Sequence, residues 1–224
     1  LVNGITFKPP FAEKAAYTLE RPRDFKDASG RALRNADSFP LKVATGDMPP
    51  LAKFAASPFG IVERFAEPDG VALLPITVRK VEAALGASAL SPRADADILA
   101  WFLKVGRYDG FFAPRKQAAL DVKGPLPQVL DADQKDYVQS RMVPLLAGQA
   151  GVRKLDMPRP AGNGPRPFEV VGIPLAPGFH VVEVASPLLG TALLDARHGS
   201  PRAMYVRTTA LVTNLGVHFK LGRE

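Results

Sequence analysis

The chain has 224 residues, of which 46% are hydrophobic and 23% charged, an ordinary balance for a globular protein. Cysteine is absent, which excludes disulfides, thiolate catalysis and zinc–cysteine sites within this sequence. The formal net charge is +7, but Lys and Arg are scattered, so a solvated surface is favoured over a nucleic-acid or other polyanion site. No apolar run reaches the length of about 18 residues that predicts a transmembrane helix.

Residues 1–47 are expected to form short strands divided by turns, with a tight turn at Asp27-Ala28-Ser29-Gly30. Three or four short strands are too few for a sandwich core of their own. We therefore expect residues 1–47 to be the C-terminal part of a β-sandwich domain. Proline cannot continue a central strand, and Pro49-Pro50 predicts a linker over residues 48–57.

Residues 58–204 are expected to form one complete β-sandwich. Runs rich in branched and aromatic residues, bounded by Gly, Pro and Asp, predict strands at 61–65, 71–81, 152–157, 168–175 and 179–186. In the last of these, Phe179, Val181 and Glu183 alternate with His180, Val182 and Val184, so the two sets should lie on opposite faces.

A helical insertion is predicted at about residues 90–150. Ile98, Leu99, Phe102 and Leu103 have helical spacing, the acidic residues Asp95 and Asp97 suit a first turn, and Gly106 suits the end.

A second, weaker helix is predicted over residues 131–149, where Tyr137, Val138, Met142 and Leu145 have helical spacing. Between the two helices, residues 113–130 are expected to form a loop and a short strand.

The chain closes on a strand-like run, residues 205–224, in which Leu215, Val217, Phe219 and Leu221 alternate with Gly, His and Lys. An open strand exposes unpaired backbone donors and acceptors. We therefore expect this run to be the first strand of a following domain.

No catalytic, metal or cofactor site is predicted. His180 and His218 are expected at solvent-facing positions of strands and His198 in a loop, with no ligand spacing between them. The acidic run of Asp131, Asp133 and Asp136 lacks the glycine and glutamate of a calcium loop, so helix capping is favoured.

One binding loop is a weak candidate, the stretch "GRYDGFF", in which aromatic rings lie near an arginine. Its candidate residues are Arg107, Tyr108, Phe111 and Phe112, with Trp101 on the preceding helix. Burial of Phe111 or Phe112 under the helix is favoured over ligand binding, and so is packing of Trp101 between the helix and a sheet.

Several stretches resemble bacterial alpha-2-macroglobulins. "VGIPLAPGFHVVEVAS" followed by "MYVRTTALVTNLGVHFKLGRE" is similar to the end of one macroglobulin domain and the start of the next. "DASGRALRNADSFPLKVATGDMPPLAKFAASPFGIVE" and "GVALLPITVRKVEA" resemble a segment in the N-terminal third of those proteins. The resemblance covers most of the chain, is weakest over residues 85–160, and depends on the order of the segments.

The resemblance implies a mainly β chain with a macroglobulin or immunoglobulin-like antiparallel β-sandwich and a short helical insertion. It implies a non-enzymatic scaffold portion of a periplasmic protease inhibitor that serves in host defence and encloses a protease after bait cleavage. Its partners would be neighbouring domains of the parent chain and, through the parent, target proteases, with any membrane attachment through a lipid anchor outside this sequence. The alternative is a β-sandwich binding module, such as an adhesin or a carbohydrate- or peptide-binding domain.

Overall fold

The structure, a computed structural model, describes residues 6–64, 70–127, 135–162, 164–194 and 203–215. The chain is mainly β and divides into two compact units, Leu1–Pro49 and Pro50–Glu224, which are described separately. No helix in the described ranges is long and apolar enough to cross a membrane.

The first unit is built on one hairpin, in which β1 (Ala16–Leu19) pairs antiparallel with β2 (Leu41–Ala44). A short 3-10 helix, η1 (Ala36–Ser38), precedes β2. The predicted turn is confirmed, because the Asp27 carboxylate accepts the backbone N–H of Ser29 and of Arg31 at 2.9 Å each. None of the unit's described residues is buried, as expected of a hairpin without a second layer.

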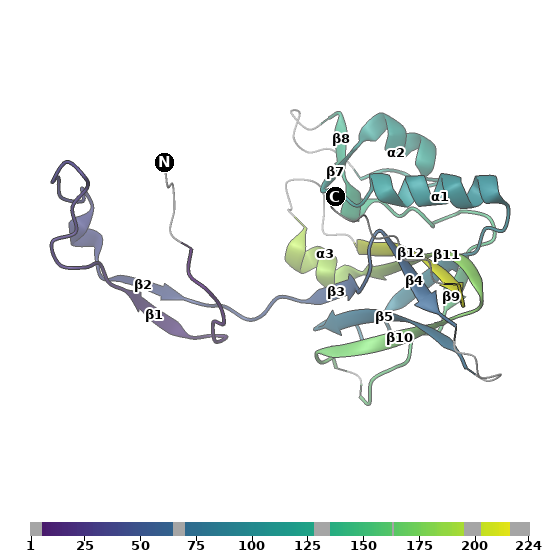
Figure 1. The fold of residues 1–224 in the computed structure, drawn as a ribbon, viewed down its shortest axis with the longest axis horizontal. Helices are drawn as coiled ribbons and strands as arrows, with labels where there is room; N and C mark the ends of the chain where they lie inside the picture. Colours follow the sequence, from purple (N-terminus) through teal and green to yellow (C-terminus); the bar gives the residue numbers. More distant parts are fainter. Residues whose placement is uncertain (1–5, 65–69, 128–134, 163, 195–202, 216–224) are drawn as a thin grey trace, which may run out of the picture. The chain divides into compact units, whose positions relative to one another are not determined.

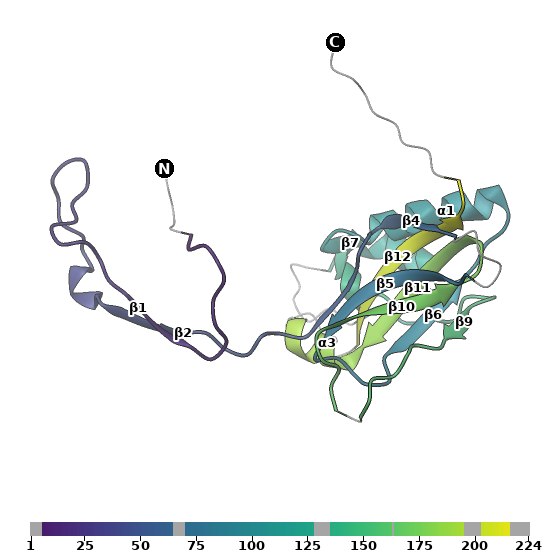
Figure 2. The ribbon, with the colours of Figure 1, turned by 60° about the horizontal axis from the view of Figure 1, so that its bottom comes forward.

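The second unit contains two main sheets (Figures 1 and 2). The three-stranded sheet is antiparallel, in the order β10 (Glu169–Leu175), β5 (Ala72–Arg79), β3 (Leu51–Phe54). The five-stranded sheet has the order β4 (Phe59–Glu63), β12 (Met204–Thr213), β11 (Gly178–Ser186), β6 (Gly86–Leu90), β9 (Arg153–Leu155). Its strands are antiparallel, except that β4 runs parallel to β12.

The core of the sandwich lies between these two sheets. On β5, Leu74, Ile76 and Val78 are at most 2% exposed, whereas Leu73 on the outer face is 51% exposed. They pack in one cluster with Val182 and other inward residues of the five-stranded sheet. The period-2 alternation of β5 therefore separates a core face from a solvent face.

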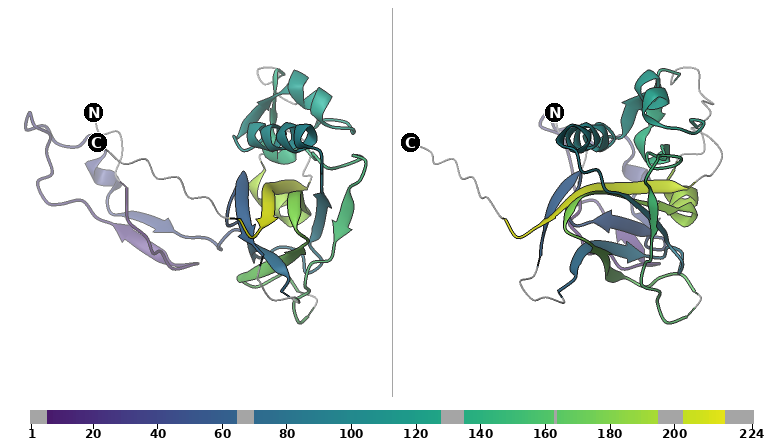
Figure 3. Two further views of the ribbon diagram at one scale, coloured as in Figure 1. Left: turned by 45° about the vertical axis from the view of Figure 1, so that its right-hand side comes forward. Right: turned by 90° about the vertical axis from the view of Figure 1, so that its right-hand side faces the viewer.

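A helical layer covers the other face of the five-stranded sheet, which makes that sheet the middle of three layers (Figure 3). The layer contains α1 (Asp95–Arg107), α2 (Arg115–Asp121), the 3-10 helix η3 (Ser140–Met142) and a small hairpin of β7 (Phe112–Pro114) and β8 (Tyr137–Gln139). A third helix, α3 (Pro187–Leu193), follows β11 directly, and the Ser186 hydroxyl caps its first turn by accepting the N–H of Leu189 at 3.0 Å.

The predicted fold class, mainly β with a sandwich and a short helical insertion, is confirmed. The helix predicted from Ile98 to Leu103 is α1. The second predicted helix is wrong where residues are described, because Tyr137–Gln139 pairs with β7 as a strand. A helix instead forms at α2, where a loop was predicted, although its sequence RKQAALD is made mostly of strong helix formers.

Two predicted boundaries are corrected by strand pairing. The linker predicted at 48–57 contains β3, in which Ala52 and Phe54 are 7% and 1% exposed. The strand predicted to open a following domain at residue 205 is β12, which pairs with β11 on one side and β4 on the other. The alternating run from Leu215 lies outside the described residues from position 216 on.

Two leucines side by side on β5 give a test of this arrangement. We expect Leu74→Ala to lower the free energy of unfolding by about 2–5 kcal/mol, because it opens a cavity between the two sheets. Leu73→Ala, the same change on the solvent face, should cost less than about 1 kcal/mol. Urea unfolding followed by circular dichroism measures both, and equal costs would contradict the assigned register.

Candidate functional site

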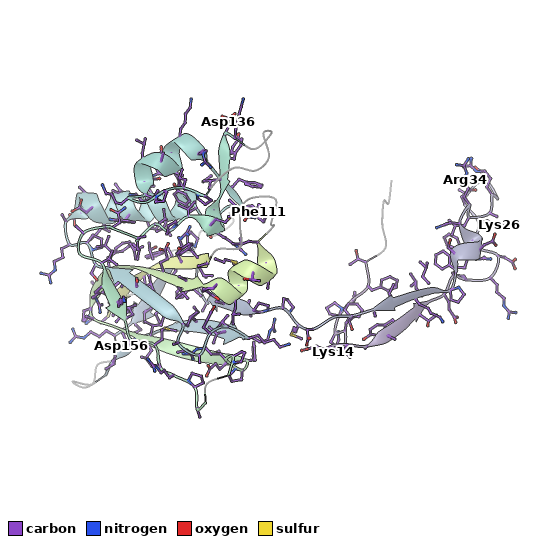
Figure 4. All side chains as sticks on the ribbon, turned by 180° about the vertical axis from the view of Figure 1, so that it is seen from behind. Lys14, Lys26, Arg34, Phe111, Asp136 and Asp156 are labelled. Atoms are coloured by element: carbon purple, nitrogen blue, oxygen red, sulfur yellow. The ribbon has the colours of Figure 1, made fainter. Side chains whose placement is uncertain are left out.

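The structure does not assemble the predicted binding loop into one platform. Tyr108 is 3% exposed and points into the helical layer, whereas Phe111 and Phe112 are 61% and 42% exposed. The predicted burial of Phe111 or Phe112 is therefore wrong. On β7, Ala113 takes the inward position and its neighbour Phe112 points outward, while Phe111 lies just before the strand. The two phenylalanine rings pack edge to face with centroids 4.8 Å apart, and Figure 4 shows Phe111 at the margin of the second unit.

Tyr108 and Arg107 join α1 to the last residue of α2. The Tyr108 hydroxyl donates to Oδ2 of Asp121 at 3.0 Å, and Arg107 Nη2 lies 3.4 Å from Oδ1. Lys104 Nζ lies 3.7 Å from the same carboxylate, which is buried. Burial and the charge of Asp121 raise the pKa of Tyr108 well above its ordinary value, so the phenol remains a hydrogen-bond donor.

Trp101 lies half-buried against the core under the helical layer, as predicted. Lys104 Nζ lies 4.4 Å from the centroid of its ring, a cation–π contact. The inward face of α1 is thus made by Ile98, Trp101, Val105 and Tyr108. Three of the five predicted loop residues, Arg107, Tyr108 and Trp101, hold the helical layer together.

A charge pair that is buried on both sides, and that sequence reasoning missed, joins β11 to β12. Arg207 Nε donates to Oε2 of Glu183 at 3.1 Å, and the two residues face each other in the strand register. Both side chains are 6% exposed. The sequence signal for this pair was Glu183 on an otherwise apolar strand face. Because an unpaired charge is rarely buried, a glutamate at such a position indicates a buried partner of opposite charge.

The backbone between η3 and β9 completes the hydrogen bonding of this pair. Glu183 accepts the N–H groups of Leu145 at 3.0 Å and Leu146 at 3.2 Å. Arg207 donates to the carbonyls of Ser140 and Val143. Burial raises the pKa of Glu183 and lowers that of Arg207, while each charge opposes the shift of the other.

His180 is buried, which corrects its predicted solvent-facing position. The ring is 3% exposed because both faces of the five-stranded sheet are covered. Ser91 Oγ lies 2.8 Å from Nδ1, and the carbonyl oxygen of Ala176 lies 2.7 Å from Nε2. Nε2–H therefore donates to the carbonyl, and Nδ1 accepts the Ser91 hydroxyl. His198 and His218 lie outside the described residues, and no cluster of metal-binding side chains occurs in the described part of the chain.

An exposed apolar surface lies on α1 and β4, and we call it the α1–β4 surface. It consists of Leu99, Phe102 and Leu103 on the helix with Phe59 and Ile61 on the strand. Leu99, Leu103 and Ile61 are each more than half exposed. The Phe59 and Phe102 rings are in edge contact, with centroids 5.5 Å apart. Most of the helical stripe that predicted α1 therefore faces outward.

Comparisons with protein-family models, with curated proteins and with solved structures found no match to this chain. Its function is therefore argued from the arrangement of its own side chains.

The buried pair should behave as a coupled unit. We expect Arg207→Met to cost about 3–5 kcal/mol, because it leaves the Glu183 carboxylate buried without its counter-charge. When Arg207→Met is already present, Glu183→Gln should lower the free energy of unfolding much less than it does alone. Urea unfolding of the natural protein, the two single variants and the double variant measures this coupling. Strictly additive costs would show that the two charges do not interact.

His180 should make stability fall in mild acid. Burial, and then the nearby Arg153 charge, hold the pKa of His180 below its ordinary value, while Ala176 opposes the shift. As the pH falls below about 6.5, His180 binds a proton in the unfolded chain but not yet in the folded chain. The free energy of unfolding therefore falls with the pH in this range. We expect the free energy of unfolding to fall more steeply between pH 7 and pH 5 in the natural protein than in His180→Asn.

Comparing the natural protein with His180→Asn cancels the contributions of the other titrating groups to the pH dependence of stability. The raised pKa of Glu183 acts with the opposite sign, because its stabilisation is lost as the pH rises through the folded value. That contribution is the same in both proteins. Denaturation curves at pH 5, 6 and 7 with equal differences throughout would show that His180 titrates alike in the two states.

Proposed function

We propose that this chain is a non-catalytic scaffold portion of a periplasmic alpha-2-macroglobulin-like protease inhibitor. In this function the α1–β4 surface contacts a neighbouring domain of the same polypeptide. The observation that carries the proposal is this exposed apolar surface, which includes the edge strand β4. The buried charges of the sandwich pair with one another and hold its layers together.

The buried charges support a structural role for the second unit. Glu183 and Arg207 are occupied by each other and by backbone groups. Asp121 is occupied by Tyr108 and basic side chains of α1. A catalytic site needs a reactive group that can reach a substrate, whereas Glu183 and Arg207 are buried between the sheet and the helical layer, and Asp121 is buried between α1 and α2.

The α1–β4 surface has the features of a protein contact. Leu99, Phe102 and Leu103 follow the i, i+3, i+4 spacing by which a helix presents one apolar face to a partner. Contiguous exposed apolar patches on soluble domains commonly mark interaction sites. The backbone edge of β4 that does not pair with β12 lies next to this surface.

A neighbouring β-domain of the same chain is the favoured occupant. The chain contains two separate compact units in succession, which meet in the sequence at Pro49 and Pro50. A succession of such units buries apolar surface between neighbours without a separate binding protein. The resemblance to alpha-2-macroglobulins, which are built of successive macroglobulin domains, points to the same arrangement.

A binding module is the second candidate, favoured by the exposed Phe111–Phe112 pair. Adjacent exposed rings can stack on a sugar or a peptide side chain. The pair is small, however, because Tyr108 and Trp101 belong to the inward side of the helical layer. A platform for a glycan would therefore have to consist of two rings.

Site-specific cross-linking tests the scaffold proposal. We expect a photo-reactive phenylalanine analogue in place of Leu103, in the full natural polypeptide, to form cross-links to another β-domain of that polypeptide. The control is the same replacement at Leu120 on α2, which is 79% exposed and lies outside the α1–β4 surface. Peptide mapping by mass spectrometry locates the products.

Two results would contradict the scaffold proposal. One is equal labelling from Leu103 and Leu120, and the other is cross-linking from Leu103 to a separate protein alone. Enclosure is measured with a protease that still cleaves a small peptide but no longer cleaves a large protein. Leu103→Lys should reduce that protection and Leu120→Lys should not, because only Leu103 belongs to the contact.

A further inference from the structure

A hollow of about 710 Å3 lies at one end of the sandwich in the second unit. It forms where β4, β6 and β12 end and where β9 and β11 begin. Its volume falls within the range of about 300–1,000 Å3 that is usual for small-molecule sites. The hollow also includes the start of β5 and the end of β10 from the three-stranded sheet, and it does not include the α1–β4 surface.

Three arginines from three elements line this hollow. Arg64 follows β4, Arg93 follows β6 by three residues, and Arg153 begins β9. No aspartate or glutamate lies among the described residues of its lining. Within the described ranges, no carboxylate forms an ion pair with any of the three, although Arg207 and Arg166 elsewhere in the unit are paired with glutamates.

A hollow in the first unit gives a useful contrast. It is of similar size, about 810 Å3, but its charges are balanced. Its charged lining residues are Arg21, Arg23 and Lys26 with Glu20, Asp24 and Asp37. The arginine hollow carries three positive charges without such compensation among its described residues, so its field favours anions.

The floor of the hollow is fixed by His180 and Ser91. The imidazole is held at both nitrogens, by the Ser91 hydroxyl at 2.8 Å and by the Ala176 carbonyl at 2.7 Å. Arg153 lies near enough that its charge contributes to the lowered pKa of His180. The buried ring therefore supplies a rigid base, while the charge of the hollow comes from the exposed guanidinium groups above it.

We propose that the arginine hollow binds a small multivalent anion, a molecule with at least two phosphoryl or carboxylate groups. A guanidinium group donates two parallel hydrogen bonds to such a group, and arginine keeps its charge at all physiological pH values. Three arginines from separate strand ends suit a ligand whose anionic groups are spaced apart. The ligand is held by charge and hydrogen bonds, and no chemical step is involved.

Calorimetric titration at low ionic strength tests this proposal. The probes are inorganic pyrophosphate and citrate, which distinguish phosphoryl from carboxylate recognition. We expect at least one of them to bind with a submillimolar dissociation constant. Binding should weaken in added salt, because exposed charges are screened.

Arg153→Gln should weaken this binding by at least about tenfold, the equivalent of one charge-assisted hydrogen bond. The matched control is Lys154→Gln, which removes the same charge from the next residue of β9. Lys154 lines a different hollow. This control should change the affinity by less than about twofold. Arg93→Gln provides a second variant on a separate loop, and circular dichroism confirms that each variant is folded.

No binding of either anion at millimolar concentration would overturn the proposal, and so would equal losses from Arg153→Gln and Lys154→Gln. Either result would leave the α1–β4 contact untouched. Conversely, failure of the Leu103 cross-link would leave the anion site standing, because the two sites share no residue.

Discussion

The second unit depends on the buried ion pair between Glu183 and Arg207, because that pair attaches the helical layer to the sheet. Removing two charges from water costs several kcal/mol for each ion, and their attraction alone does not always recover that cost. Here the backbone of Leu145, Leu146 and the η3 turn supplies the remaining hydrogen bonds. The segment that carries these groups must therefore pass directly over β11 and β12. An apolar contact would allow the layer to slide, whereas this set of directional bonds specifies one position.

That constraint explains why the five-stranded sheet is covered on both sides. Phe179 and Val181 pack under the helical layer, while Val182 and Val184 pack against the three-stranded sheet. A strand of this kind has no solvent face. Successive residues of β11 contact the helical layer and the three-stranded sheet in turn, so its two faces could be predicted from the sequence. The burial of His180 could not, because the sequence does not show that both faces are covered.

Local signals predicted α1 and several strands, but they missed β3 and β8, whose places in the fold depend on distant partners. The turn after Asp27 and the alternation of residues 179–186 are local features, and both predictions were confirmed. The apolar stripe that predicted α1 did not identify its inward face, because Leu99 and Leu103 are as apolar as the residues that are buried. The Tyr108 hydroxyl also donates to Asp121 on α2, a contact that periodicity alone does not predict.

The strand β12 shows the same limit at the scale of the whole unit. Its composition predicted a strand, but its partners are β11, the preceding strand, and β4, which lies some 150 positions earlier in the chain and runs parallel to it. Pairing over such a separation leaves no mark in either segment alone. The candidate surfaces were missed for a related reason, since the arginine hollow assembles three strand ends and the α1–β4 surface joins a strand to a helix.

The division of charge within the unit connects these features to function. Glu183 pairs with Arg207, and Asp121 lies against Tyr108 and Lys104, so these buried acids connect the layers of the unit. The proposed contacts instead use an apolar stripe on α1 and arginines at the strand ends. These two surfaces suit different occupants, because an apolar stripe excludes water against a protein face and a guanidinium cluster attracts an anion. One body can carry both surfaces at once, since β4 contributes Phe59 and Ile61 to the α1–β4 surface and is followed by Arg64 at the arginine hollow.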